Sequence, residues 1–127
     1  MDYSHLVKLR QTHPAWRLMR ADNAPLIVSF LQQAFIDPNR RSVRQSELVL
    51  MLDDFLYHLR LSEGEDAFPK SPHHYLEDWA HNDKGWLRKF YPVDSDEAAF
   101  DLTPGTEKAI GWLVNLQHSS FVGTESR

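Results

Sequence analysis

The chain has 127 residues, a net charge of -4 at neutral pH and no cysteine. Its length suits one domain with a modest core. The lack of cysteine excludes a disulfide framework and a thiolate metal site. With 42% hydrophobic and 25% charged residues, the composition is that of a globular protein. Because we see neither an apolar signal core nor a run near the roughly 18 apolar residues of a membrane span, we expect a cytoplasmic protein.

Residues 1–22 read as an N-terminal helical arm. The pair His13-Pro14 interrupts its helical pattern, because proline disfavours helix in the residue before it. Asp22 or Asn23 can then cap a helix with a proline in its first turn. The apolar residues of this helix recur at helical spacing: Leu26, Ile27, Phe30, Leu31, Ala34 and Phe35.

The longest helix is expected to start at Ser42 or Ser46 and to run to about Leu61, stopping before Gly64. Its inner stripe consists of Leu48, Leu52, Phe55 and Leu59. Other apolar residues lie off this stripe, which is more than a helix with one solvated side requires. We therefore predict a second packing surface, whose candidate contacts in a homodimer are Leu50, Met51, Tyr57 and Leu61.

A helix opening at Ser71-Pro72 precedes two strands and a closing helix. The strands are expected at residues 86–91 and 98–102, with an acidic loop between them, and Thr103-Pro104 caps the closing helix. The inward residues of that helix would be Ala109, Ile110, Leu113 and Leu116. This order predicts an α+β, mostly helical fold: a winged-helix domain with a two-stranded wing over residues 23–117. Residues 118–127 would begin a linker to a C-terminal part that lies beyond this sequence.

The expected recognition helix and wing are acidic, whereas a DNA-reading winged helix usually carries Lys or Arg there. No Lys or Arg occurs between Pro72 and Asp83. The candidate docking residues for a basic partner are Glu77, Asp78, Asp94, Asp96 and Glu97. The candidates for DNA contact precede the longest helix: Arg40, Arg41 and Arg44. Ordinary solvated surface is the alternative for both groups.

Motifs for catalysis are missing from the sequence. Neither a phosphate-binding loop nor a nucleophile elbow occurs. His74, Asp78 and His81 share one face of a helix, but without a fourth ligand this spacing is weak evidence for a metal. We expect no enzymatic activity, no metal and no cofactor. The four tryptophans are expected in the core or at its edge.

Five segments of the chain resemble the N-terminal region of the DUF3375 family. They read HPAWRLMRADNAPL (13–26), FIDPNRRS (35–42), GWLRKFYP (85–92), LTPGTEKA (102–109) and FVGTESR (121–127). That family includes the MukF-like kleisin subunit of the Wadjet bacterial defence system. The resemblance implies a non-enzymatic subunit of an SMC-type complex that eliminates plasmid DNA, with the nuclease on another subunit.

The N-terminal winged-helix domain of such kleisins dimerises, and the subunit binds an SMC-type ATPase and a kite subunit. The resemblance therefore implies a homodimeric protein-interaction domain that meets plasmid DNA through the complex rather than strongly by itself. The alternative is a DNA-binding winged-helix transcription regulator, which a salt-dependent duplex-binding assay would distinguish.

Overall fold

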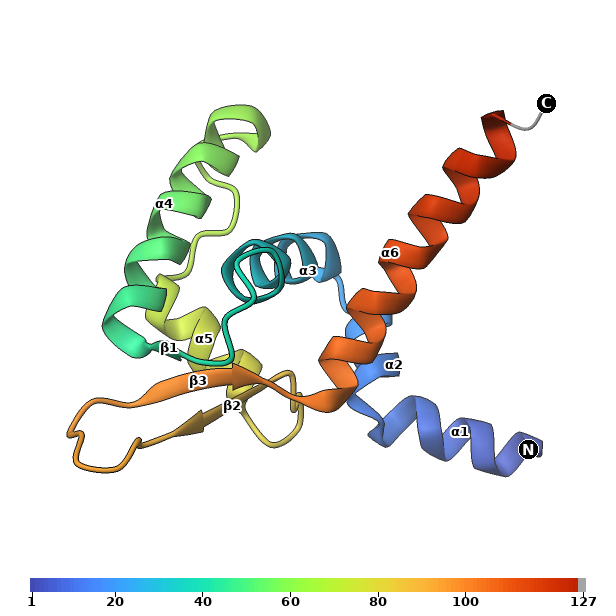
Figure 1. Ribbon diagram of the computed structural model, residues 1–127, viewed down its shortest axis with the longest axis horizontal. Coiled ribbons are helices and arrows are strands. Elements are labelled where there is room, and N and C mark those ends of the chain that lie inside the picture. The colour runs from blue at the N-terminus through green and yellow to red at the C-terminus, as the bar shows by residue number, and fades with distance from the viewer. Residues whose placement is uncertain (126–127) are drawn as a thin grey trace.

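The structure is a computed structural model that describes residues 1–125, and its fold is α+β with helices predominating (Figure 1). The elements are α1 (Tyr3–Thr12), α2 (Pro14–Arg20), α3 (Ala24–Leu31), the π-helical turn η1 (Gln32–Ile36), β1 (Val43–Arg44), α4 (Gln45–Glu63), α5 (Pro72–Ala80), β2 (Leu87–Phe90), β3 (Ala99–Leu102) and α6 (Pro104–Glu125). None of the described helices is long and apolar enough to cross a membrane.

The sheet has three antiparallel strands in the order β1-β3-β2. The hairpin β2–β3 confirms the two expected strands, and Leu87 lies opposite Leu102 in its register. The strand β1 was not foreseen, because two residues are too few to show a period. Val43 pairs with Phe100 and is buried, so the helix expected from Ser42 or Ser46 starts between these two positions, at Gln45. Its end before Gly64 is confirmed, and Gly64 adopts a φ of 114° there.

The core lies where α3, α4 and α5 meet the sheet. Phe30 occupies its centre, with its ring centroid 5.4 Å from that of Phe55 and 6.2 Å from that of Trp79. Leu48 and Leu52 are buried as expected, whereas Phe55 is only half-buried. Leu56 takes the third buried position on α4 instead. Its burial fits a helical repeat of 3.6 residues, because Leu56 follows Leu52 by little more than one turn.

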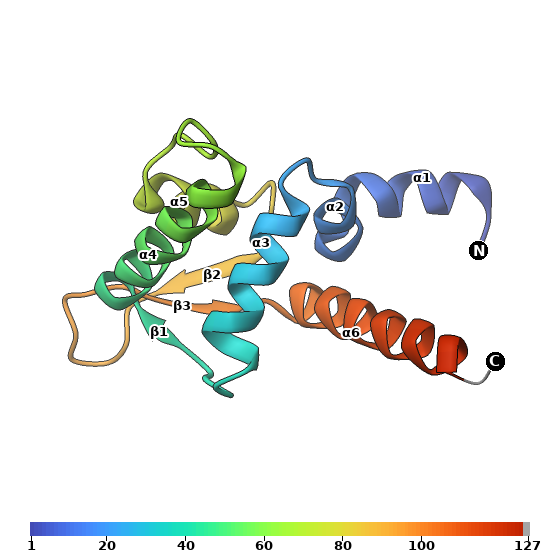
Figure 2. The same cartoon turned by 90° about the horizontal axis from the view of Figure 1, so that it is seen from above.

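The arm is fixed to the domain at the start of α2. The indole Nε1 of Trp86 donates a hydrogen bond to the carbonyl oxygen of Pro14 at 3.1 Å. Pro14 also packs closely on Gly105, where a Cβ would lie 3.2 Å from the Pro14 Cβ. His13 caps α2 by accepting a hydrogen bond from the Ala15 N–H. By contrast α1 projects away from the domain and buries no residue (Figures 1 and 2).

The helix α6 is longer than the sequence pattern indicated. It passes through His118, Ser119 and Ser120, where the linker was expected to begin, and reaches Glu125. Histidine and serine each cost a helix only about 0.5 kcal/mol relative to alanine, so they do not end the helix. Leu116 was expected inward but is exposed, whereas Leu113 and Val114 lie on the side of α6 that faces α3. The division of the chain into domains stays a prediction.

Candidate functional site

The outer face of α4 carries three apolar side chains in a row. Leu50, Tyr57 and Leu61 are 69%, 60% and 71% exposed, and their spacing of seven and four residues places them on one side of the helix. They lie opposite the buried Leu48 and Leu52. The fourth candidate, Met51, is half-buried and packs against the core, so only part of its side chain is open to a partner. We call Leu50, Tyr57 and Leu61 the α4 stripe.

Charged side chains accompany the α4 stripe. Asp54 lies between Leu50 and Tyr57 on the same face, and the Nδ1 of His58 is 3.6 Å from its carboxylate. The His58 ring also stands edge-on to the Tyr57 ring, with centroids 5.4 Å apart. The α4 stripe is therefore apolar, with the carboxylate of Asp54 and the imidazole of His58 beside its middle.

The acidic residues of α5 are partly neutralised by a lysine on β2 and by another in the turn that precedes it. The ammonium of Lys89 on β2 lies 2.6 Å from the Glu77 carboxylate, and this hydrogen bond raises the pKa of Lys89. Asp78 lies 3.8 Å from the ammonium of Lys84. These contacts leave α5 less negative than its sequence indicates, and they weaken its expected attraction for a basic partner.

Glu97 has a structural task that the sequence did not reveal. Its Oε2 accepts a hydrogen bond from the backbone N–H of Ser46 at 2.8 Å, so it caps the N-terminus of α4. Beside it, the Gln45 N–H donates to the Ala98 carbonyl at 2.9 Å. The hydrogen bond with Ser46, helped by the nearby charge of Arg44, lowers the pKa of Glu97. Glu97 is thus turned towards α4.

The two aspartates at the tip of the β2–β3 loop remain available. Asp94 and Asp96 are exposed, and neither forms an ion pair within the described residues. Asp94 has a φ of 62°, the left-handed conformation that aspartate tolerates better than most residues. Of the predicted docking residues, these two present the least compensated negative charge.

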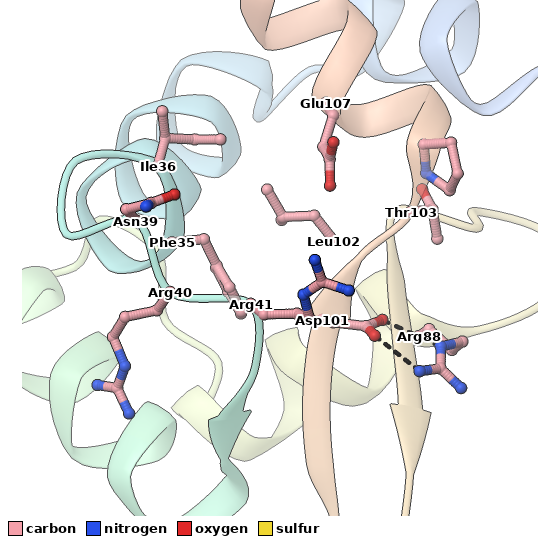
Figure 3. A pocket seen from close by; sticks show the side chains of 11 residues that line it. Phe35, Ile36, Asn39, Arg40, Arg41, Arg88, Asp101, Leu102, Thr103 and Glu107 are labelled. Carbon is pink, nitrogen blue, oxygen red and sulfur yellow. Dashed lines mark hydrogen bonds and ion pairs between the residues drawn. The ribbon is translucent and has the colours of Figure 1, made fainter.

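The three arginines proposed for DNA contact do not form one patch. Arg40 makes a two-pronged ion pair with Glu47, which raises the pKa of Arg40. Arg44 lies 3.7 Å from Glu97. Arg41, like Arg40, lines a pocket of about 710 Å³, but it forms no ion pair among the described residues. Figure 3 shows Arg40 and Arg41 pointing in different directions.

The pocket around Arg41 lies between η1, the hairpin and the start of α6 (Figure 3). Arg88 on its wall is held by Asp101 through two hydrogen bonds of 3.1 and 2.7 Å. Glu107 of α6 adds a second carboxylate. The acidic and basic groups therefore largely offset each other, and the pocket does not concentrate charge of one sign.

No metal-binding group of three or more His, Cys, Asp or Glu occurs among the described residues.

A second apolar surface, between α2 and α6, was missed. Trp79 and Trp86 are buried as expected, but Trp16 and Trp112 are partly exposed. These two line a groove of about 560 Å³ together with Ala15, Met19, Lys108 and Ala109. The spacing of Trp112 and Leu116 on one helix was visible in the sequence, yet spacing does not reveal where the body that covers a helix ends. We call this feature the α2–α6 groove.

Comparison with known proteins places the chain within one family. The family model described as "Protein of unknown function (DUF3375)" matches residues 8–127. A protein of Mycolicibacterium smegmatis, described as "Uncharacterized protein", is 51% identical over 127 residues. The match includes 100% of this chain and 27% of that relative, so the chain spans about a quarter of its length. No solved structure matches the chain.

Proposed function

From its membership in the DUF3375 family, we propose that the chain is the N-terminal dimerisation and protein-interaction domain of a kleisin-like subunit. The subunit would belong to an SMC-type complex of the Wadjet kind, in which JetA is the kleisin. In that role it would serve bacterial defence against plasmid DNA, join two complexes into a pair, and leave the chemistry to other subunits.

The order of the elements supports a winged-helix reading of the domain. In a winged helix, a short strand lies between the first two helices and a hairpin follows the third. Here α3, β1, α4, α5, β2 and β3 follow in that order, and the sheet order is β1-β3-β2. In this reading α5 is the recognition helix and the β2–β3 loop is the wing.

The charges on these elements favour a protein partner over a duplex. The helix α5 contains no Lys or Arg, although phosphate contacts supply much of the affinity of DNA-binding domains. Lys89, the nearest ammonium on β2, is engaged by Glu77. A transcription regulator that reads DNA through α5 would need cations on that surface.

The observation that carries the proposal is the exposed α4 stripe. Isolated apolar side chains on a surface are common, but three on one helix face, opposite the core, fit a helix that is covered on both sides. Interfaces of homodimers are more apolar than the rest of a protein surface. The α4 stripe is therefore our proposed centre of self-association.

The sequence of α4 is self-complementary in an antiparallel pair. If two copies of α4 pack about a twofold axis between Phe55 and Leu56, Leu50 is level with Leu61 of the partner subunit. In the same register Tyr57 is level with Asp54 of the partner subunit. The tyrosine hydroxyl group would then reach the carboxylate of that aspartate. Such isologous pairing satisfies both copies equally, as a twofold interface requires.

Solution mass across a concentration series tests this proposal. We expect dimers of the wild-type chain, and monomers with intact helical content for Leu50→Glu and Leu61→Glu. The matched control is Leu116→Glu, an exposed leucine outside the stripe, which should stay dimeric. A wild-type chain that remains monomeric at high micromolar concentration would contradict the dimer. The proposed complex is tested separately, by co-purifying the full-length protein with its SMC-type ATPase and kite subunit.

A further inference from the structure

The α2–α6 groove is a second apolar surface, distinct from the α4 stripe. Trp112 on its α6 side is 56% exposed, and Leu116, which follows it outside the groove lining, is 50% exposed. They lie about one helical turn apart, so both belong to one side of α6. On the α2 side, Trp16 and Met19 have the same relation and are partly exposed. The groove therefore has two apolar walls, each one turn long.

Its composition is typical of a site that anchors a partner. Tryptophan and methionine are enriched in protein interfaces, and tryptophan is frequent among the residues that dominate binding energy. Burying such side chains removes a large apolar area from water. Among the described residues, those that line the groove all belong to α2 and α6, and α6 runs outward from the sheet (Figures 1 and 2).

The groove and the α4 stripe need different occupants. They lie at opposite ends of the molecule, since α4 packs on one end of the sheet and α2 and α6 extend from the other (Figures 1 and 2). A twofold dimer uses the same patch on both copies. A dimer formed through the α4 stripe therefore leaves both of its α2–α6 grooves open.

The charge around the groove indicates the chemistry of its occupant. The arm, residues 1–22, contains four basic residues, Lys8, Arg10, Arg17 and Arg20, and two acidic ones, Asp2 and Asp22. Lys108 lies on the α6 wall of the groove itself. Since the whole chain has a net charge of -4, this end is basic on an otherwise acidic protein. Complementary charge at the rim would favour an acidic partner over a basic one.

We propose that the α2–α6 groove binds an amphipathic helix of another protein, with its apolar face between Trp16 and Trp112 and its acidic residues facing Lys108 and Arg20. Arg20 follows Trp16 by four residues and so lies on the same side of α2. The apolar lining favours a helix over duplex DNA, which would present sugars and phosphates to two tryptophans. The proposal goes beyond self-association, because it assigns a second partner.

Two synthetic helical peptides of about 14 residues, or four turns, test the groove with the whole chain. Both carry leucines at helical spacing on one face. One has glutamates and the other has lysines in the flanking positions. Fluorescence anisotropy of the labelled peptides gives their affinities. We expect the glutamate peptide to bind at least about tenfold more tightly at low salt, and this preference to shrink as salt screens the charges.

Variants locate the binding. Trp112→Ala should weaken the glutamate peptide at least about tenfold, the loss of one interface anchor, and Lys108→Glu should diminish or reverse the preference between the peptides. Because Trp112 and Lys108 are exposed, both variants should retain the wild-type circular dichroism. Leu61→Glu on the α4 stripe is the control and should bind the peptide normally even if it abolishes the dimer.

Three outcomes would overturn the proposal. The first is equal binding, or no binding, of the two peptides. The second is a Trp112-dependent complex with duplex DNA that displaces the peptide. The third is self-association that disappears in Trp112→Ala, since a second copy would then occupy the groove. Failure of the α4 dimer alone leaves the groove proposal intact, because Leu61→Glu and Trp112→Ala act at separate surfaces.

Discussion

The carboxylate of Glu97 caps a helix that lies 51 residues earlier, by accepting a hydrogen bond from the N–H of Ser46 at 2.8 Å. An α-helix leaves its first N–H groups without partners inside the helix, and an anion at that end also meets a favourable dipole. Arg44, which precedes α4, offers no side-chain cap of its own. Glu97 therefore connects the β2–β3 loop to α4.

Removing this cap should destabilise the domain. We expect Glu97→Ala to lower Tm more than Glu97→Gln, because glutamine retains an oxygen that can accept the Ser46 hydrogen bond. Thermal unfolding followed by circular dichroism gives both values. The control is Asp96→Asn at an exposed neighbouring position, which should leave Tm unchanged. Equal Tm values for wild type and Glu97→Ala would show that the cap contributes nothing.

The same contact predicts a pH dependence. The pKa of Glu97 is lowered from its ordinary value of 4.5 in the folded chain. A group with a lowered folded pKa stabilises the fold above its unfolded pKa, and this stabilisation is lost as the pH falls through the folded pKa. The difference in Tm between wild type and Glu97→Gln should therefore be full at neutral pH and shrink progressively below about pH 4.5. A difference that stays constant to pH 3 would contradict it.

The bond from Trp86 to Pro14 should hold the arm in place. Trp86→Phe removes the indole N–H and leaves the Pro14 carbonyl without this hydrogen bond. The loss should lower the free energy of unfolding by about 1–3 kcal/mol. Denaturation in urea measures this cost. Trp112→Phe is the matched control, because Trp112 is exposed and makes no hydrogen bond through its indole among the described residues. It should stay within about 0.5 kcal/mol of wild type.

The isolated domain should bind duplex DNA weakly. Arg40 and Arg44 are engaged by Glu47 and Glu97, so we expect residual binding to depend more on Arg41. Fluorescence anisotropy should give a Kd no tighter than the roughly 1–100 µM of non-specific binding, rising steeply with salt. Arg41→Ala should weaken it more than Arg40→Ala. Tight, sequence-specific binding that depends on His73 or His74 of α5 would favour the transcription regulator instead.

The tip of the β2–β3 loop offers a sharper test of docking than its whole acidic run. Because Glu97 caps α4 and Asp94 has a φ of 62°, Asp94 is best replaced by asparagine, which tolerates the left-handed conformation, while the exposed Asp96 can be reversed. If the tip docks on a basic surface of the SMC-type ATPase, Asp94→Asn with Asp96→Lys should slow association and reduce its salt dependence. Stopped-flow association measures both effects. Unchanged kinetics, with Tm also unchanged, would mean that the tip is only solvated surface.

The sequence alone determined the features that depend on neighbouring residues. Ser71 caps α5 through the His74 N–H, as its position before Pro72 indicated, and Gly64 ends α4. The hairpin β2–β3 and the family of the chain could also be predicted, because strand patterns and family motifs are contained in short segments of sequence. Local features of this kind can be predicted without knowing how the elements pack.

Tertiary structure decided which of these residues remain available for function. Trp79 and Trp112 are the same residue type on helices, yet one is buried and the other exposed, because only α5 lies against the sheet along its length. The sequence showed Glu97 as one acid among several, and only folding brought it to Ser46. The burial of a side chain and the capping of a helix by a distant residue depend on how the elements pack together. Side-chain periodicity within one element does not specify that packing.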